Sequence, residues 1–201
     1  MKAMHLMGPA PYYTNCYLLI SDAGNAVIID PAVSAAQADK VLEEQKAHLT
    51  HILLTHGHFD HVYGLEELRS NHPDAKLYMC AEDALGNDYY PPKEFDVALE
   101  DGDVVKADEM EFKVYRTPGH TPGSCCFLCR DMFFTGDTLF HLSIGRTDLP
   151  GGDFQQMSQS LAKLRDLPIA NGTQVLPGHA DFSTMGEEKA CNPYLQTMEE
   201  F

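Results

Sequence analysis

The chain has 201 residues, of which 44% are hydrophobic and 22% charged, which suits a soluble globular protein with a sizeable core. Its formal net charge of −16 repels phosphate backbones and anionic lipid, so we expect neither nucleic acid nor membrane as a partner. No apolar run reaches transmembrane length and residues 1–5 lack the apolar stretch of a secretory signal, so we expect a cytoplasmic protein.

Strands and helices are predicted to alternate in the first half of the chain. In chain order we expect a β-hairpin formed by residues 16–20 and 26–29, a helix over residues 35–45 and a strand over residues 52–54. A second helix over residues 62–68 and a further strand over residues 77–80 follow. Ser34 is placed to cap the first helix, whose inner face would carry Ala38, Val41 and Leu42. Residues 89–93 indicate an irregular surface loop that could border a pocket.

The second half repeats this order with more strands. Its predicted strands are residues 104–105, 112–115, 124–129, 132–134 and 175–176, and its predicted helices begin at residue 153 or 154 and after residue 185. Two β-rich halves that each carry helices favour an α/β sandwich with mixed sheets inside and helices outside. We expect residues 1–201 to form one such domain.

The six cysteines do not form a regular disulfide pattern. Cys126 and Cys129 match the C-x-x-C spacing of redox and zinc pairs, but they lie in an apolar run with the character of a buried strand. Successive side chains of a strand face opposite ways. We therefore predict free thiols packed as small hydrophobic side chains.

A dense group of metal-binding side chains follows the predicted strand at residues 52–54. His56, His58, Asp60 and His61 fall within six residues, and imidazole and carboxylate groups are ligands for zinc, iron and manganese. Gly57 allows the backbone to turn between two of them. A solvated polar loop would rarely hold so many such residues, so we predict a metal site.

Three more segments place one His or Asp in a glycine-containing turn beside an apolar strand. These residues are His120, Asp137 and His179. Each alone would more often be an ordinary turn, since aspartate beside glycine is common turn chemistry. Together with the histidine cluster they form a specific pattern.

This pattern resembles the metallo-β-lactamase superfamily over most of the chain. The resemblance implies a four-layer αββα sandwich, with two mixed β-sheets flanked by helices. It also implies one metal ion at His56, His58 and His120, a second at Asp60, His61 and His179, and Asp137 as the bridge between them. Two divalent ions are expected, with zinc as the first choice and iron or manganese as alternatives.

Within that superfamily the pattern is most similar to glyoxalase II, a thioesterase that cleaves S-D-lactoylglutathione. Lactam-cleaving members typically carry Cys where this chain has Asp137, and oxygen-reducing diiron members carry Glu in place of His58. We expect a metal-bridging hydroxide to attack a small thioester, with Asp60 as both ligand and proton acceptor. Arg146 and His141 are the expected substrate-binding residues.

Two departures from glyoxalase II leave alternatives open. Only residues 180–201 follow His179, too few for the helical C-terminal domain that supplies much of the glutathione site in glyoxalase II, and Asp148 replaces an expected Tyr. Persulfide dioxygenases, which are oxidoreductases, resemble the chain comparably and would bind a single iron through His56, His120 and Asp137. A metal-binding protein without catalysis is the remaining alternative, although all seven ligand positions are filled.

Overall fold

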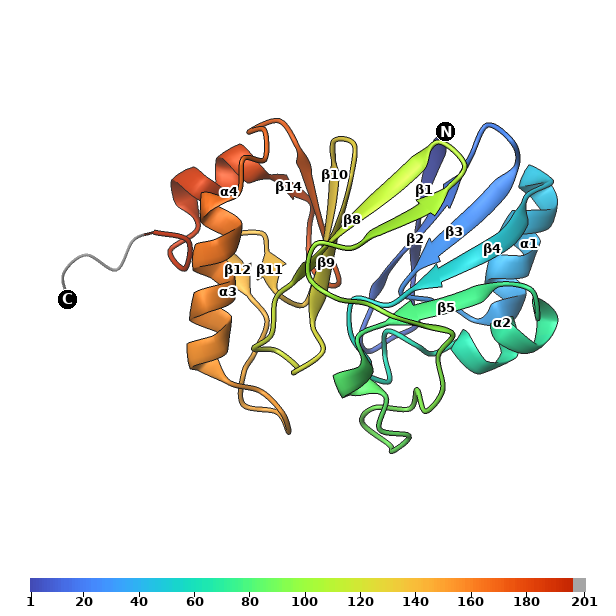
Figure 1. Cartoon of the computed structure of the whole chain (residues 1–201), viewed down its shortest axis with the longest axis horizontal. Coiled ribbons are helices and arrows are strands. Elements are labelled where there is room, and N and C mark those ends of the chain that lie inside the picture. The colour runs from blue at the N-terminus through green and yellow to red at the C-terminus, as the bar shows by residue number, and fades with distance from the viewer. Residues whose placement is uncertain (197–201) are drawn as a thin grey trace.

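The N-terminal half of the chain forms a six-stranded mixed sheet, in a computed structural model that describes residues 1–196 (Figure 1). Its strands lie side by side in chain order: β1 (Lys2–Met7), β2 (Asn15–Ile20), β3 (Asn25–Ile29), β4 (His48–Leu53), β5 (Lys76–Met79) and β6 (Val97–Ala98). The pairs β1–β2 and β2–β3 are antiparallel, and the remaining pairs are parallel. Parallel neighbours need crossover connections, and α1 (Ala35–Gln45) and α2 (Leu65–Asn71) lie in two of them.

The C-terminal half forms a second six-stranded sheet. Its order across the sheet is β14 (Ser183–Thr184), β13 (Gln174–Pro177), β10 (Met132–Gly136), β9 (Cys125–Cys129), β8 (Met110–Arg116) and β7 (Val104–Ala107). The parallel pair β10–β13 is connected through a small hairpin and a helix, which are β11 (Leu139–Phe140) with β12 (Ser143–Ile144) and α3 (Phe154–Asp166). The chain continues into α4 (Met185–Cys191), and one 3₁₀ turn, η1 (Ala81–Asp83), follows β5.

Local capping chemistry explains where α1 and α3 begin. The Ser34 side chain accepts a hydrogen bond from the backbone N–H of Gln37, and Asp153 accepts one from Gln156 at 2.9 Å. Each bond satisfies one of the backbone donors left unpaired in a first helical turn. The predicted bounds of the first helix and the predicted start of the third at residue 153 or 154 are confirmed.

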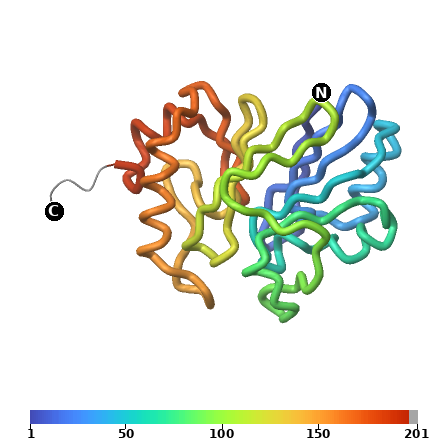
Figure 2. Tube along the Cα trace, viewed as in Figure 1, coloured from blue at the N-terminus to red at the C-terminus, as the bar shows by residue number. Residues whose placement is uncertain are grey.

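Three apolar core layers lie between the four structural layers, which are helices, sheet, sheet and helices. Figure 2 shows the path of the chain through these layers. One face of the first sheet packs on α1 and α2 through residues such as Leu18, Ile28 and Leu42. The two sheets bury their facing sides between them, and the outer face of the second sheet packs on α3 and α4. Successive residues of one strand, such as Ile28 and Ile29, therefore enter different layers. The predicted αββα sandwich is confirmed.

Some short or exposed strands escaped the sequence prediction. Only two residues of β1, Met4 and Leu6, pack against the first core layer, and the strand forms because β2 offers it a partner over six residues. The two-residue strands β6, β11, β12 and β14 are too short for any periodicity to be visible. Cys126 and Cys129 are free and buried in β9, as predicted.

The segments that carry the expected ligands meet at one edge of the two sheets. They follow β4, β10 and β13 or join β8 to β9. Backbone hydrogen bonds tie them together in pairs, because Cys125 N–H donates to the Thr55 carbonyl at 2.8 Å and Gly178 N–H donates to the Gly136 carbonyl at 2.9 Å. Among residues 1–196, no helix is long and apolar enough to cross a membrane.

Candidate metal centre

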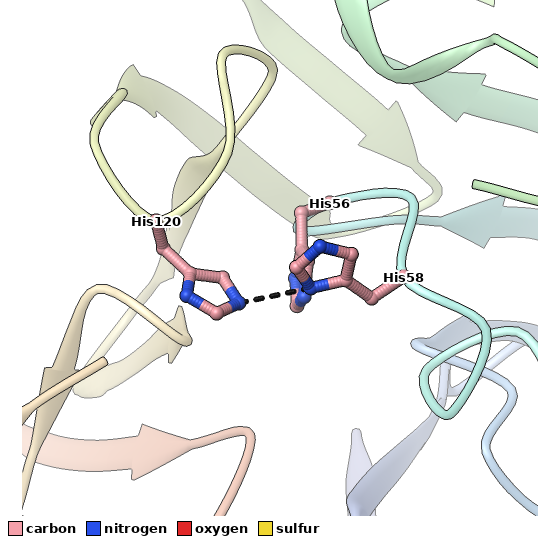
Figure 3. A group of neighbouring side chains, drawn as sticks. All are labelled: His56, His58 and His120. Atoms are coloured by element: carbon pink, nitrogen blue, oxygen red, sulfur yellow. Dashed lines mark hydrogen bonds between the residues drawn. The ribbon is translucent and has the colours of Figure 1, made fainter. Parts of the chain in front are cut away.

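Three histidines from two loops face a common point (Figure 3). His56 and His58 follow β4, and His120 lies in the turn between β8 and β9. His58 Nδ1 is 3.0 Å from His120 Nε2, and the ring of His56 is centred 4.8 and 4.9 Å from the other two. Their ligand atoms all lie within 4.8 Å of one another, which suits a single small cation.

A second group lies beside the first. Asp60, His61 and His179 also bring one ligand atom each within 4.8 Å of the others. His179 Nε2 is 3.2 Å from Asp60 Oδ2 and 3.4 Å from His61 Nε2. The structure therefore brings these six expected ligands together in the two sets of three that the sequence pattern implied.

The Asp137 carboxylate reaches both groups. Its Oδ2 is 3.3 Å from His120 Nε2 and 3.5 Å from His179 Nε2, and its Oδ1 is 3.3 Å from His61 Nε2. The side chain is thus placed to contact an ion in either group or ions in both.

Several imidazoles are oriented through the nitrogen that faces away from the centre. His120 Nδ1 donates to the Arg146 carbonyl at 2.7 Å, and His179 Nδ1 donates to the Tyr12 carbonyl at 3.2 Å. A carbonyl only accepts, so Nδ1 of each ring carries a proton. The Nε2 lone pair is then available for a metal ion, an arrangement typical of metal-binding histidines.

Asp30 has a role that the sequence analysis did not predict. Its carboxylate accepts bonds from Thr55 N–H at 2.8 Å, from the Thr55 hydroxyl at 2.6 Å and from His61 Nδ1 at 3.0 Å. Those contacts engage both oxygens, so Asp30 supports His61, and one Asp30 oxygen also lies within 4.8 Å of ligand atoms of His56 and His61 in a third candidate metal group. The available signal was an aspartate directly after the apolar strand β3, which is a weak indication because aspartate is frequent in turns.

Burial and neighbouring charges set the protonation of the donors. Burial lowers the pKa of His58 to about 4 and that of His56 well below its ordinary value, so both rings are neutral at pH 7. Burial alone would raise the pKa of Asp137, but the charges of His61 and His120 hold it well below the ordinary range. Burial alone would lower the pKa of His61 and of His179, but Asp137 raises that of His61 and Asp60 raises that of His179 above the ordinary value. Neutral imidazole and ionised carboxylate are the forms that bind metal ions, so these two rings would give up a proton when an ion binds.

Unsatisfied polar atoms test whether a metal ion fits here. Among residues 1–196, His56 Nε2, His58 Nε2 and Asp137 Oδ1 are buried and have no hydrogen-bond partner. Leaving such atoms unpaired costs roughly 1–3 kcal/mol each. An ion at the centre would satisfy the atoms that face it, and the donor set of nitrogen and oxygen suits zinc, iron or manganese. The residues present therefore fit divalent metal ions.

A cavity of about 680 Å³ opens over the centre. Apart from expected ligands, its lining is mostly apolar, and it consists of Pro11, Tyr12, Phe59, Tyr89, Phe140, Ser143, Ile144, Arg146 and Leu149. Tyr89 belongs to the loop that was expected to border a pocket. His141 is not among the residues that line this cavity within the described chain, and its Nε2 lies 3.3 Å from Glu187 Oε1 of α4. We therefore do not assign His141 to substrate binding.

Known proteins share both the fold and much of the sequence. The chain is 34% identical to the hydroxyacylglutathione hydrolase GloC of Haemophilus influenzae, over 92% of this chain and 94% of that protein. The crystal structure of the BLEG-1 B3 metallo-beta-lactamase is 31% identical, with a TM-score of 0.86 over 96% of this chain and 99% of that one. The structure of ETHE1 from Myxococcus xanthus is 33% identical, with a TM-score of 0.83 over 96% and 84% of the respective chains.

The sequence profile that describes the metallo-beta-lactamase superfamily matches residues 9–179. This span contains all seven expected ligands, from His56 to His179, and both β-sheets except for β1 and β14 at their edges. The chain therefore belongs to the metallo-beta-lactamase superfamily.

Proposed function

We propose that this chain hydrolyses a small thioester of the S-D-lactoylglutathione type, using two divalent metal ions, with zinc as the first choice. The contact of Asp137 with both ligand groups carries this proposal, because one carboxylate then connects two adjacent cation sites. The similarity to GloC over nearly the full length of both chains supports a thioester as the substrate class.

Two bound divalent ions would acidify a water molecule and polarise the substrate carbonyl. Asp60 lies beside this point, and its Oδ2 accepts a hydrogen bond from the Thr14 hydroxyl at 2.8 Å. Burial alone would raise the pKa of Asp60, but hydrogen bonds from His179 and Thr14 and the charge of His61 lower it to about 2. The carboxylate is thus ionised at neutral pH and can accept a proton only from a strongly acidified water.

The cavity walls determine how a substrate would lie. Tyr12, Phe59 and Tyr89 form an aromatic wall, with ring centroids 5.1 Å apart for Tyr12–Phe59 and 6.2 Å apart for Phe59–Tyr89. Within residues 1–196, Arg146 supplies the one lysine or arginine side chain in the lining. An acyl or thiol group with apolar surface would pack on the aromatic wall, and a carboxylate of the substrate would face Arg146.

We expect Arg146→Ala to raise KM for an anionic thioester roughly fivefold and to change kcat less. The guanidinium Nε and terminal nitrogen contact the Asp148 carboxylate at 2.6 and 2.8 Å, so a substrate carboxylate must compete with Asp148. The Arg146 carbonyl, which orients His120, remains in the variant. Steady-state kinetics at low ionic strength measure both parameters.

Asp148→Ala is the matched control for this effect. Removing the competing carboxylate leaves the guanidinium free, so KM for the same anionic substrate should fall. An unchanged KM in both variants would remove Arg146 from substrate binding.

A second candidate is the mononuclear iron persulfide dioxygenase type of reaction. The compactness of His56, His120 and Asp137 favours it, because His120 Nε2 is 3.3 Å from Asp137 Oδ2 and the His56 and His120 rings are centred 4.9 Å apart. The similarity to ETHE1 is a second reason to test it.

One experiment separates these functions. Purified protein is analysed for metal content and then assayed on S-D-lactoylglutathione, on glutathione persulfide with an oxygen electrode, and on a chromogenic cephalosporin. Two metal ions per chain and thioester cleavage without oxygen uptake are expected. One iron per chain with persulfide-dependent oxygen uptake would replace our proposal with the dioxygenase, and cephalosporin cleavage alone would replace it with a lactamase.

A further inference from the structure

Asp83 is a completely buried acidic residue with no part in the metal centre described above. It ends the 3₁₀ turn η1 after β5, and its side chain is 0% exposed. A buried carboxylate is costly unless hydrogen bonds satisfy it. The partners of Asp83 therefore indicate what it stabilises.

Within the described part of the chain, the hydrogen bonds that the Asp83 carboxylate accepts come from the two loops that carry His56, His58 and His120. Oδ2 accepts from Gly57 N–H at 3.0 Å and from the Thr121 hydroxyl at 2.7 Å. Oδ1 accepts from Gly123 N–H at 2.8 Å. Gly57 lies between His56 and His58, and Thr121 directly follows His120.

Both glycines approach Asp83 more closely than any other residue type could. A Cβ on Gly57 would lie 2.8 Å from the Asp83 carbonyl oxygen, and a Cβ on Gly123 would lie 2.6 Å from the Asp83 carboxyl carbon. Real Cβ atoms essentially never come within 3.0 Å of such neighbours. The fit between Asp83 and the two loops is therefore close on both sides.

We propose that Asp83 is a positioning residue that sets the distance between the His56–His58 loop and the His120 loop, and thereby determines the metal affinity of this three-histidine site. The second group, Asp60, His61 and His179, receives its support from Asp30, Thr14 and Tyr12. The effect of Asp83 is thus confined to one of two adjacent sites. This inference concerns metal binding and holds whichever reaction the centre performs.

The physical reason is that three ligands bind tightly only when their separation already matches the ion. His58 and His120 belong to loops 62 residues apart in the chain, and their nitrogens must be held close together before the ion binds. The Asp83→Asn substitution replaces one of the two accepting oxygens with an NH2 group, which only donates. This group would either face a donor of one of the loops or turn away, and in both cases at least one of the three hydrogen bonds is lost. Loss of such support typically weakens metal binding 10- to 100-fold.

The test compares Asp83→Asn in two backgrounds. His179→Ala disables the second group and leaves the three-histidine site, whereas His58→Ala does the reverse. Zn²⁺ dissociation constants of the apoproteins are measured by competition with a chromophoric chelator. Asp83→Asn should weaken Zn²⁺ binding at least about tenfold in the His179→Ala background and less than about threefold in the His58→Ala background.

Glu188→Gln is the control for a merely structural effect. Glu188 is also 0% exposed, and its Oε2 accepts from Leu142 N–H at 3.0 Å and from Asn192 at 2.7 Å, away from the ligand loops. It should lower thermal stability without changing Zn²⁺ affinity in the His179→Ala background.

Thr121→Val provides a milder variant, because it removes one hydroxyl donor and keeps the carboxylate. It should weaken the three-histidine site several-fold even if Asp83→Asn does not fold. Equal weakening at both sites, or unchanged affinity of the three-histidine site in the variant that folds, would overturn the proposal.

Discussion

Asp137→Ala should reduce the metal content from two ions to one or none per chain and lower thioester hydrolysis at least about 10³-fold. The side chain contacts both ligand groups, at 3.3 Å from His120 and from His61, so its loss removes a negative ligand from each. Polarisation of a reacting carbonyl by metal ions is worth several kcal/mol, and about 4 kcal/mol corresponds to a factor of ~10³ in rate. Elemental analysis and initial rates measure the two effects.

Asp181→Ala is the matched control for this variant. Asp181 is an exposed aspartate two residues after His179, so the same substitution is made close to the centre without removing a ligand. It should keep both metal content and turnover. If the Asp137 variant, fully depleted of metal, retained the turnover of the unchanged protein, the proposed dinuclear mechanism would be wrong.

Gly178→Ala should inactivate the protein through a single methyl group. A Cβ at this position would lie 2.3 Å from Asp137 Oδ1 and 2.5 Å from His61 Cε1, whereas ordinary contacts begin at 3.4 Å. At least one of these two ligands must therefore move by about 1 Å. A displacement of that size costs about 100-fold in rate when it affects the reacting geometry, and we expect a comparable loss of turnover together with weaker metal binding.

Gly172→Ala tests whether the effect is specific to the site. Nothing lies within 4 Å of a Cβ at Gly172, and its backbone is outside the positive-φ region, so the substitution should be neutral or slightly stabilising. Thermal melting and metal analysis of both variants make the comparison. Wild-type metal affinity and turnover in Gly178→Ala would contradict the close approach on which the prediction depends.

Elements that depend on short-range patterns could be predicted from the sequence. The helix at Ala35–Gln45 combines a serine cap with apolar positions spaced for one face, and both features act within a few residues. The hairpin of β2 and β3 was visible because turn residues separate two apolar runs. Such elements depend on local interactions, so a sequence without coordinates is enough to place them.

Elements that depend on a distant partner could not be predicted from the sequence. β1 is largely exposed and is stabilised by its pairing with β2, and β14 has only two residues paired with β13. Likewise Asp30 and Asp83 look like ordinary loop aspartates in the sequence. Their importance comes from donors 25 to 40 residues away, such as Thr55 N–H and Gly123 N–H.

The amino-acid sequence by itself determined the set of candidate metal ligands, because imidazole and carboxylate groups clustered beside glycines indicate a metal site. The tertiary structure alone decided how those ligands relate in space. Asp60 and Asp30 are both aspartates near His61, yet Asp60 Oδ2 lies 3.2 Å from His179 Nε2, whereas Asp30 Oδ2 accepts a hydrogen bond from His61 Nδ1 at 3.0 Å. That distinction depends on how two sheets pack, and packing joins residues that no local pattern connects.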